Sequence, residues 1–217
     1  MYFLKKNLPV NISCYFLEYK GRGARVKEDF AFDIWEVVED LYFKIERLLQ
    51  QPYALYGHSM GAKVAYLLAK RIQQENRPLP VHLFISGTDA PSIPNKKTIR
   101  YLLPKEEFIT SIKEMGGLPD EVLQNQELLE YFEPILRADF KASESYVHKV
   151  ALPLNIPITV LTGDQEDLEQ DDVREWQNET TVPVKFHKFA GNHFFIFHHQ
   201  KEIGEIIATA LGFKTKA

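Results

Sequence analysis

The sequence predicts an α/β protein in which helices flank a mostly parallel sheet. Short β-prone runs alternate with amphipathic helical segments over most of the 217 residues. Such alternation produces βαβ units and therefore parallel strands covered by helices. A second observation is the absence of any β-rich run between about residues 96 and 150. We therefore expect one domain over residues 1–217, with an all-helical lid insertion at 96–150.

Each expected element has a local signal. Residues 2–8 are predicted to end a helix, and the apolar run 12–19 to form a mostly buried strand. Asp33 is the expected N-cap of an amphipathic helix that ends near Pro52. The remaining strands are expected at 53–56, 81–87, 158–162 and 184–189, and the remaining helices from 62 to about 76, through Trp176, and at 202–211.

Composition excludes several classes of function. The formal net charge is −4, so there is no basic surplus for nucleic acid. No apolar run approaches the roughly 18 to 20 residues of a membrane span. Cys14 is the single cysteine, which excludes an intrachain disulfide and favours a reducing compartment. We expect a cytoplasmic monomer with no nucleic-acid or membrane partner.

The stretch Gly57-His58-Ser59-Met60-Gly61 lies between a β-prone run and a helix-prone run. This is the local context of a nucleophile elbow, in which a strand turns sharply into a helix and presents a serine. Residues without Cβ are expected on either side, because neighbouring backbone comes close. Ser59 is therefore the predicted nucleophile, and the N–H of Met60 is the predicted oxyanion donor.

A serine nucleophile needs a base, which a third group orients. Among seven histidines, His193 alone follows a predicted strand in a glycine-flanked loop, where α/β sheets carry functional groups. His58 is expected to point away from the elbow and to pack around the turn. Acids follow two earlier strands, and Asp167 or Asp89 would each give the serine–acid–histidine order of α/β-hydrolases. The acids after the strand 158–162 are Asp164, Glu166 and Asp167.

Several motifs in the same order resemble type II thioesterases, the stand-alone editing enzymes of nonribosomal peptide and polyketide synthases. These motifs are Gly57-His58-Ser59-Met60-Gly61 with Ala62, Gly21-Arg22-Gly23-Ala24-Arg25, Ser86-Gly87 with Ala90-Pro91, Leu136-Arg137-Ala138-Asp139-Phe140, and Gly191-Asn192-His193-Phe194-Phe195. The resemblance implies the α/β-hydrolase fold and a triad of Ser59, Asp167 and His193. Asp89 is the alternative acid, because thioesterases fused to the end of a synthetase more often take it from the earlier strand.

The resemblance also implies a substrate and a partner. The substrate would be an aberrant or stalled acyl group on the phosphopantetheine arm of an acyl or peptidyl carrier protein. No metal or dissociable cofactor is expected. Because carrier proteins are acidic, we expect a local basic or apolar docking patch. Arg22, Arg25 and the lid are candidates for it, and ordinary surface charge is the alternative role of each arginine.

The chain departs from the family pattern at its start. The family begins with a strand and a loop such as Phe-Ala-Gly-Gly, which supplies the second oxyanion donor, and this sequence lacks both. We expect that about thirty residues, the size of one βα unit, are missing relative to the family. The absent strand would lie between 12–19 and 53–56 and leave two unpaired edges. Two alternative functions stay open: a medium-chain acyl-thioester or general serine esterase and, because this loop is missing, a catalytically impaired carrier-binding module.

Overall fold

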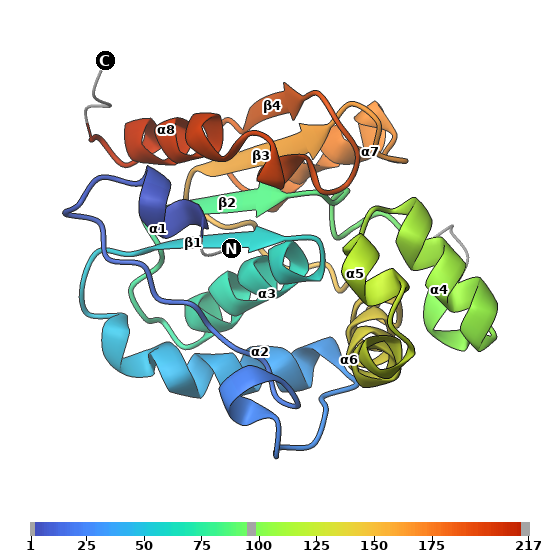
Figure 1. Ribbon diagram of the computed structural model, residues 1–217. Coiled ribbons are helices and arrows are strands. Elements are labelled where there is room, and N and C mark those ends of the chain that lie inside the picture. The colour runs from blue at the N-terminus through green and yellow to red at the C-terminus, as the bar shows by residue number, and fades with distance from the viewer. Residues whose placement is uncertain (1–2, 95–98, 214–217) are drawn as a thin grey trace.

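The computed structural model describes residues 3–94 and 99–213, which form a central sheet between layers of helices (Figure 1). The strands are β1 (Ala54–His58), β2 (His82–Ser86), β3 (Ile158–Gly163) and β4 (Lys185–Phe189). They lie in the order β1-β2-β3-β4, and each neighbouring pair is parallel. The predicted α/β class, with a parallel sheet flanked by helices, is confirmed.

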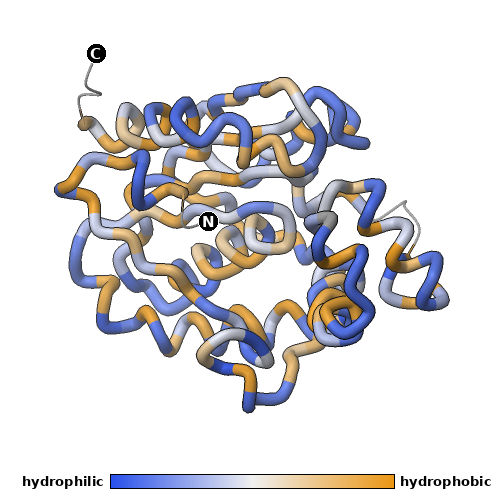
Figure 2. Tube along the Cα trace, viewed as in Figure 1, coloured by the Kyte–Doolittle hydropathy of each residue, from blue (hydrophilic) through white to orange (hydrophobic). Residues whose placement is uncertain are grey.

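The two faces of the sheet carry separate apolar clusters, because successive side chains of a strand point to opposite faces. Leu83 and Ile85 of β2 pack in the cluster formed with α2 (Ile34–Ile45) and α3 (Met60–Gln74). Phe84, between them, belongs to the cluster with α1 (Phe3–Asn7) and α8 (Gln200–Ala210). Figure 2 shows apolar residues concentrated along the sheet and the inner side of α3.

The first long helix begins where the sequence predicts. The carboxylate of Asp33 accepts a hydrogen bond from the N–H of Trp35 at 2.7 Å, which makes Asp33 the N-cap of α2. Its apolar residues at helical spacing are buried against the sheet and α3. A short 3-10 turn, η2 (Glu46–Leu48), then leads toward β1. The N-cap and the apolar stripe together explain this element.

The prediction of a strand at residues 12–19 is wrong. Residue 12 lies in a bend, residues 13–19 have no regular secondary structure, and Tyr15 is 69% exposed. A strand requires a neighbour for its backbone N–H and C=O groups. In the described residues β1 is the edge of the sheet on this side, and nothing pairs with its outer edge. The apolar run is therefore strand-like in sequence but pairs with no strand of the described residues, and the outer edge of β1 stays unpaired.

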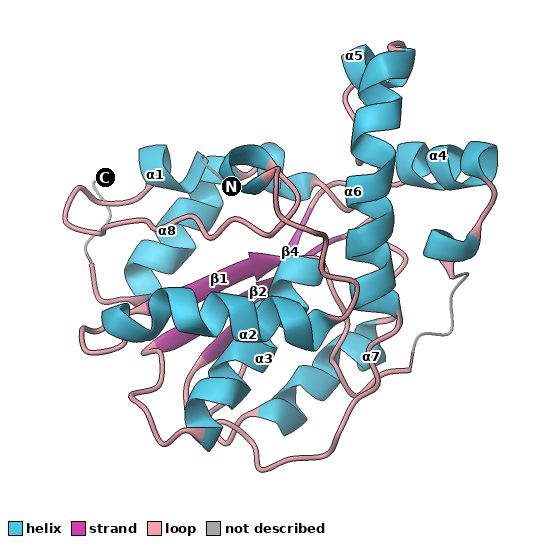
Figure 3. Ribbon diagram, turned by 90° about the horizontal axis from the view of Figure 1, so that it is seen from below, coloured by secondary structure: helices cyan, strands magenta, loops and turns pink. Residues whose placement is uncertain are grey.

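Helices occupy the stretch where the lid was predicted, although residues 95–98 at its expected start lie outside the described residues. The helices are η3 (Arg100–Leu102), α4 (Lys105–Glu114), α5 (Asp120–Leu123) and α6 (Gln126–Glu144). Figures 1 and 3 show them beyond the carboxyl ends of the strands. Arg137 of α6 donates hydrogen bonds to the carbonyls of Tyr101 and Leu103 at 3.0 and 2.9 Å. That arginine ties α6 to the connection before α4.

Short elements complete the fold around the ends of β3 and β4. They are α7 (Gln170–Arg174), η4 (Glu175–Glu179), η5 (Phe195–Phe197) and, near the start of the chain, η1 (Gly23–Arg25). Trp176 of η4 is fully buried. Within the described ranges, no helix is both long and apolar enough to cross a membrane.

Candidate active site

Ser59 stands between β1 and α3 in a strained backbone conformation. Its φ and ψ are 56° and −123°, a region that residues with a Cβ rarely adopt. The N–H of Ser59 donates to the carbonyl of Ser86 at 2.8 Å, which holds the turn against β2. The strand-to-helix turn predicted from the pentapeptide is present, and Ser59 is its strained residue.

The two glycines of the pentapeptide differ in the space available for a side chain. A Cβ added to Gly57 would lie 1.9 Å from the carbonyl oxygen of Gly61, which no side-chain movement can relieve. A Cβ added to Gly61 would meet only the hydroxyl of Tyr19, at 3.5 Å. The close backbone approach therefore explains Gly57, whereas Gly61 has room for a methyl group.

This difference gives a stability prediction. Gly57→Ala should lower the free energy of unfolding by about 3 kcal/mol or more, because backbone atoms must move apart. Gly61→Ala is the matched control and should be neutral or stabilise by up to about 1 kcal/mol, since alanine favours helix. Chemical denaturation of both variants measures the difference. Equal stability of the two variants would contradict the close approach seen at Gly57.

His193 lies in the loop after β4 and is fixed by a carboxylate. Its Nδ1 donates to Oε1 of Glu166 at 2.6 Å, and the side chains of His193 and Glu166 are 15% and 2% exposed. The second oxygen of Glu166 accepts from the N–H of Gly163 at 2.7 Å. Because an ionised carboxylate only accepts, this bond places the ring hydrogen on Nδ1 and leaves Nε2 to act as a base.

The loops after β3 and β4 are bound to each other. Gly191 donates to the carboxylate of Asp164 at 2.8 Å, and Gln165 donates to the carbonyl of Gly191 at 3.0 Å. A Cβ on Gly163 would lie 2.5 Å from that same carbonyl oxygen. These contacts bring the acid-rich loop directly beneath His193.

The prediction that Asp167 orients His193 is corrected to Glu166. The turn after Gly163 folds the carboxylate of Glu166 inward to His193, whereas the next residue, Asp167, is exposed. The alternative acid, Asp89, accepts a hydrogen bond from Thr88 at 3.3 Å, and no hydrogen bond in the described part of the chain joins it to His193. Sequence reasoning named Glu166 among three clustered acids but had no signal for which one faces inward.

The sequence suggested that His58 points away from the elbow, but the structure places its side chain within the site. Its ring lies against that of His193, with centroids 4.7 Å apart and planes tilted by 40°. Its Nδ1 is 2.9 Å from the hydroxyl oxygen of Ser86. Burial, together with the smaller effect of the neighbouring His193, lowers the pKa of His58 to about 3. His58 is therefore a neutral ring in contact with the predicted base.

The elbow also places Met60, the predicted oxyanion donor. Met60 is the first residue of α3, where a backbone N–H has no acceptor within the helix. Its role as oxyanion donor stays a prediction. Among the hydrogen bonds of the described residues, none joins the Ser59 hydroxyl to His193. Such bonds are often long until substrate binds.

The two arginines suggested for partner docking are engaged within the chain. Arg22 forms two hydrogen bonds to the carboxylate of Asp139 in α6, at 2.6 and 2.7 Å. Arg25 forms ion pairs with Asp40 at 2.6 Å and Glu28 at 2.5 Å. Arg22 thus links the start of the chain to the helical insertion, and the suggestion that these arginines form a docking patch is not supported.

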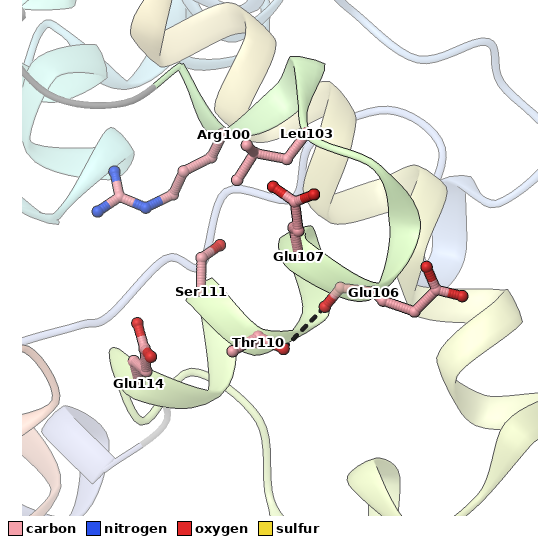
Figure 4. A pocket seen from close by; sticks show the side chains of 7 residues that line it. All are labelled: Arg100, Leu103, Glu106, Glu107, Thr110, Ser111 and Glu114. Atoms are coloured by element: carbon pink, nitrogen blue, oxygen red, sulfur yellow. Dashed lines mark hydrogen bonds between the residues drawn. The ribbon is translucent and has the colours of Figure 1, made fainter.

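A cavity of about 440 Å³ lies on the helical insertion and not at Ser59 (Figure 4). Its lining is mostly acidic and polar: Arg100, Leu103, Glu106, Glu107, Thr110, Ser111 and Glu114. Thr110 donates to the carbonyl of Glu106 at 2.8 Å within α4.

In the part of the chain that the structure describes, no cluster of three His, Cys, Asp or Glu side chains could hold a metal ion.

Comparison with known proteins identifies the family of the chain. The sequence pattern of the thioesterase domain family matches residues 2–211. Gramicidin S biosynthesis protein GrsT of Aneurinibacillus migulanus is 34% identical over 204 residues, covering 94% of this chain and 80% of that protein.

Two solved structures are also similar. ClbQ from the colibactin NRPS/PKS pathway superposes with a TM-score of 0.91 at 31% identity, covering 97% of this chain and 90% of ClbQ. The type II thioesterase BorB from the borrelidin biosynthetic cluster superposes with a TM-score of 0.82 at 33% identity, covering 89% of this chain and 79% of BorB. The chain therefore belongs to the thioesterase domain family and, within it, to the type II thioesterases.

Proposed function

We propose that this protein hydrolyses acyl thioesters on the phosphopantetheine arm of carrier proteins, and so removes aberrant or stalled groups in nonribosomal peptide or polyketide biosynthesis. The observation that carries the proposal is the strained turn at Ser59, whose preceding residue, His58, contacts a histidine that Glu166 orients. The pathways named for GrsT, ClbQ and BorB support this substrate class over fatty-acyl thioesters.

The proposed reaction uses the site residues in two steps. Ser59 attacks the thioester carbonyl while Nε2 of His193 accepts the serine proton, and the N–H of Met60 donates to the oxyanion. His193 then returns the proton to the departing thiol. In the second step His193 deprotonates a water molecule, which attacks the acyl-serine; His193 then returns the proton to the departing Ser59 oxygen, and the acid is released.

The helical insertion touches the loop that carries the base. A Cβ on Gly116, between α4 and α5, would lie 2.9 Å from Nδ2 of Asn192. A Cβ on the adjacent Gly117 would lie 3.4 Å from Cε2 of Phe194. The insertion therefore contacts both neighbours of His193, which supports the proposal that it covers the bound acyl group as a lid.

The proposal predicts a preference for carrier-bound substrate. One acyl group should be presented on a phosphopantetheinylated carrier protein, on coenzyme A and as a simple ester, at equal concentrations. We expect kcat/KM on the carrier to exceed that on coenzyme A by about tenfold or more, because the carrier adds binding surface beyond the shared arm. Ser59→Ala is the control for each substrate.

The other outcomes separate the alternative functions. Equal rates on all three substrates would indicate a general esterase or medium-chain thioesterase. Carrier binding without turnover that depends on Ser59 would indicate a binding module. Either result would overturn the proposed function.

A further inference from the structure

We propose that His58 is a positioning residue for the catalytic base. Its neutral ring packs against the imidazole of His193 and holds that imidazole in the orientation in which it is bonded to Glu166. The inference rests on the function proposed above, because it gives His193 the role of base. It assigns a function to the residue before Ser59 that the pentapeptide pattern leaves open.

His193 is held from three directions. Nδ1 is bonded to Glu166 at 2.6 Å. The His193 ring forms an edge-to-face pair with Phe194, at a centroid distance of 5.1 Å and an interplanar angle of 87°. The His58 ring covers another side, at a centroid distance of 4.7 Å. A hydrogen bond at one nitrogen fixes a point but allows the ring to swing, so the two flanking rings must set its orientation.

His58 is itself rigidly placed. Its Nδ1 is 2.9 Å from the hydroxyl of Ser86, which is fully buried in β2. A Cβ on Gly87 would lie 2.5 Å from Cε1 of His58 and 3.2 Å from Cε1 of His193. Gly87 thus lies against both rings, and the space that a side chain would fill at this position is taken mainly by the ring of His58. Because the His58 ring is fixed by these contacts, it can restrict the rotation of the His193 ring that packs against it.

The chemistry of His58 fits a packing role beside His193 and not the role of a second base. Its Nε2 is buried and makes no hydrogen bond within the described residues. Because burial keeps this ring uncharged, it places no like charge beside His193 when the base accepts a proton from Ser59. A neutral aromatic face also tolerates a cation close to it. The ring can therefore remain in contact with His193 through both protonation states.

The chain offers a matched control in His82. This residue is also buried, its Nε2 is 2.8 Å from the hydroxyl of Thr159, and its ring stacks on Phe84 at a centroid distance of 4.3 Å. Burial lowers its pKa to about 4. His82 thus shares two features with His58, a hydroxyl partner and a neighbouring aromatic ring, but its ring stacks on Phe84, whereas that of His58 lies tilted against His193.

The test compares phenylalanine and glutamine at the two positions. His58→Phe keeps a flat ring and loses the bond to Ser86, whereas His58→Gln keeps a polar group toward Ser86 and loses the ring. We expect His58→Gln to lower kcat about 10- to 100-fold with KM within about twofold, as for a misplaced base. His58→Phe should stay within about threefold of the wild type, and His82→Phe and His82→Gln within about twofold.

The measurements use an activated small ester and labelling of Ser59 by a fluorophosphonate, both of which report on the Ser59–His193 pair whatever the natural acyl carrier. The proton on Nδ1 of His193, observed by NMR, should exchange faster with water in His58→Gln than in His82→Gln. Wild-type rates in His58→Gln, or a lower rate in His58→Phe than in His58→Gln, would overturn the inference. Failure on carrier thioesters with the expected ranking on the ester would overturn only the proposed function.

Discussion

Ser59→Gly should abolish thioester hydrolysis and yield a more stable protein than Ser59→Ala. Both variants remove the nucleophile, so we expect turnover to fall by about 10⁴-fold or more. They differ in the backbone, because alanine must keep the φ of 56° that serine has and glycine adopts it without steric cost. Relief of that strain, less the larger chain entropy of unfolded glycine, should favour Ser59→Gly by about 1 kcal/mol.

Chemical denaturation of the two variants gives the stability difference, and hydrolysis of an activated ester gives the activity. Wild-type Ser59 should resemble the alanine variant in stability, since both carry a Cβ. Turnover retained by either variant would contradict the assignment of Ser59 as nucleophile. A glycine variant less stable than the alanine variant would contradict a strained elbow.

Glu166→Gln should lower kcat by about 10³- to 10⁴-fold with little change in KM. The amide cannot stabilise the imidazolium that forms when His193 accepts the serine proton, and its NH₂ group can turn the ring to the wrong tautomer. The wild-type carboxylate is 2.6 Å from Nδ1 and nearly inaccessible to water. No other carboxylate in the described residues is hydrogen-bonded to that nitrogen.

The matched controls are the two acids that the sequence favoured. Asp167→Asn and Asp89→Asn make the same change of chemical group at an exposed and at a partly buried position. We expect both to stay within about threefold of the wild-type rate, because the carboxylate bonded to Nδ1 of His193 is that of Glu166. Loss of activity in Asp167→Asn with a functional Glu166→Gln would restore the assignment made from sequence.

Features that depend on local order can be predicted from the amino-acid sequence. The apolar runs predict buried strands, and the spacing and N-cap of 33–49 predict a helix, since these signals depend only on neighbours in the chain. The elbow is also local, because Gly57, Ser59 and Gly61 are adjacent and their strain arises within one turn. His193 could be chosen because loops after parallel strands meet at one edge of a sheet.

The tertiary structure alone decided which side chains face one another. Asp164, Glu166 and Asp167 have similar chemistry and occupy one turn, and only the packing of that turn against Gly191 selects Glu166 for His193. The contact of His58 with His193 joins residues 135 positions apart. The run 12–19 shows the reverse case, because a β-prone sequence forms no strand without a neighbouring strand to accept its hydrogen bonds.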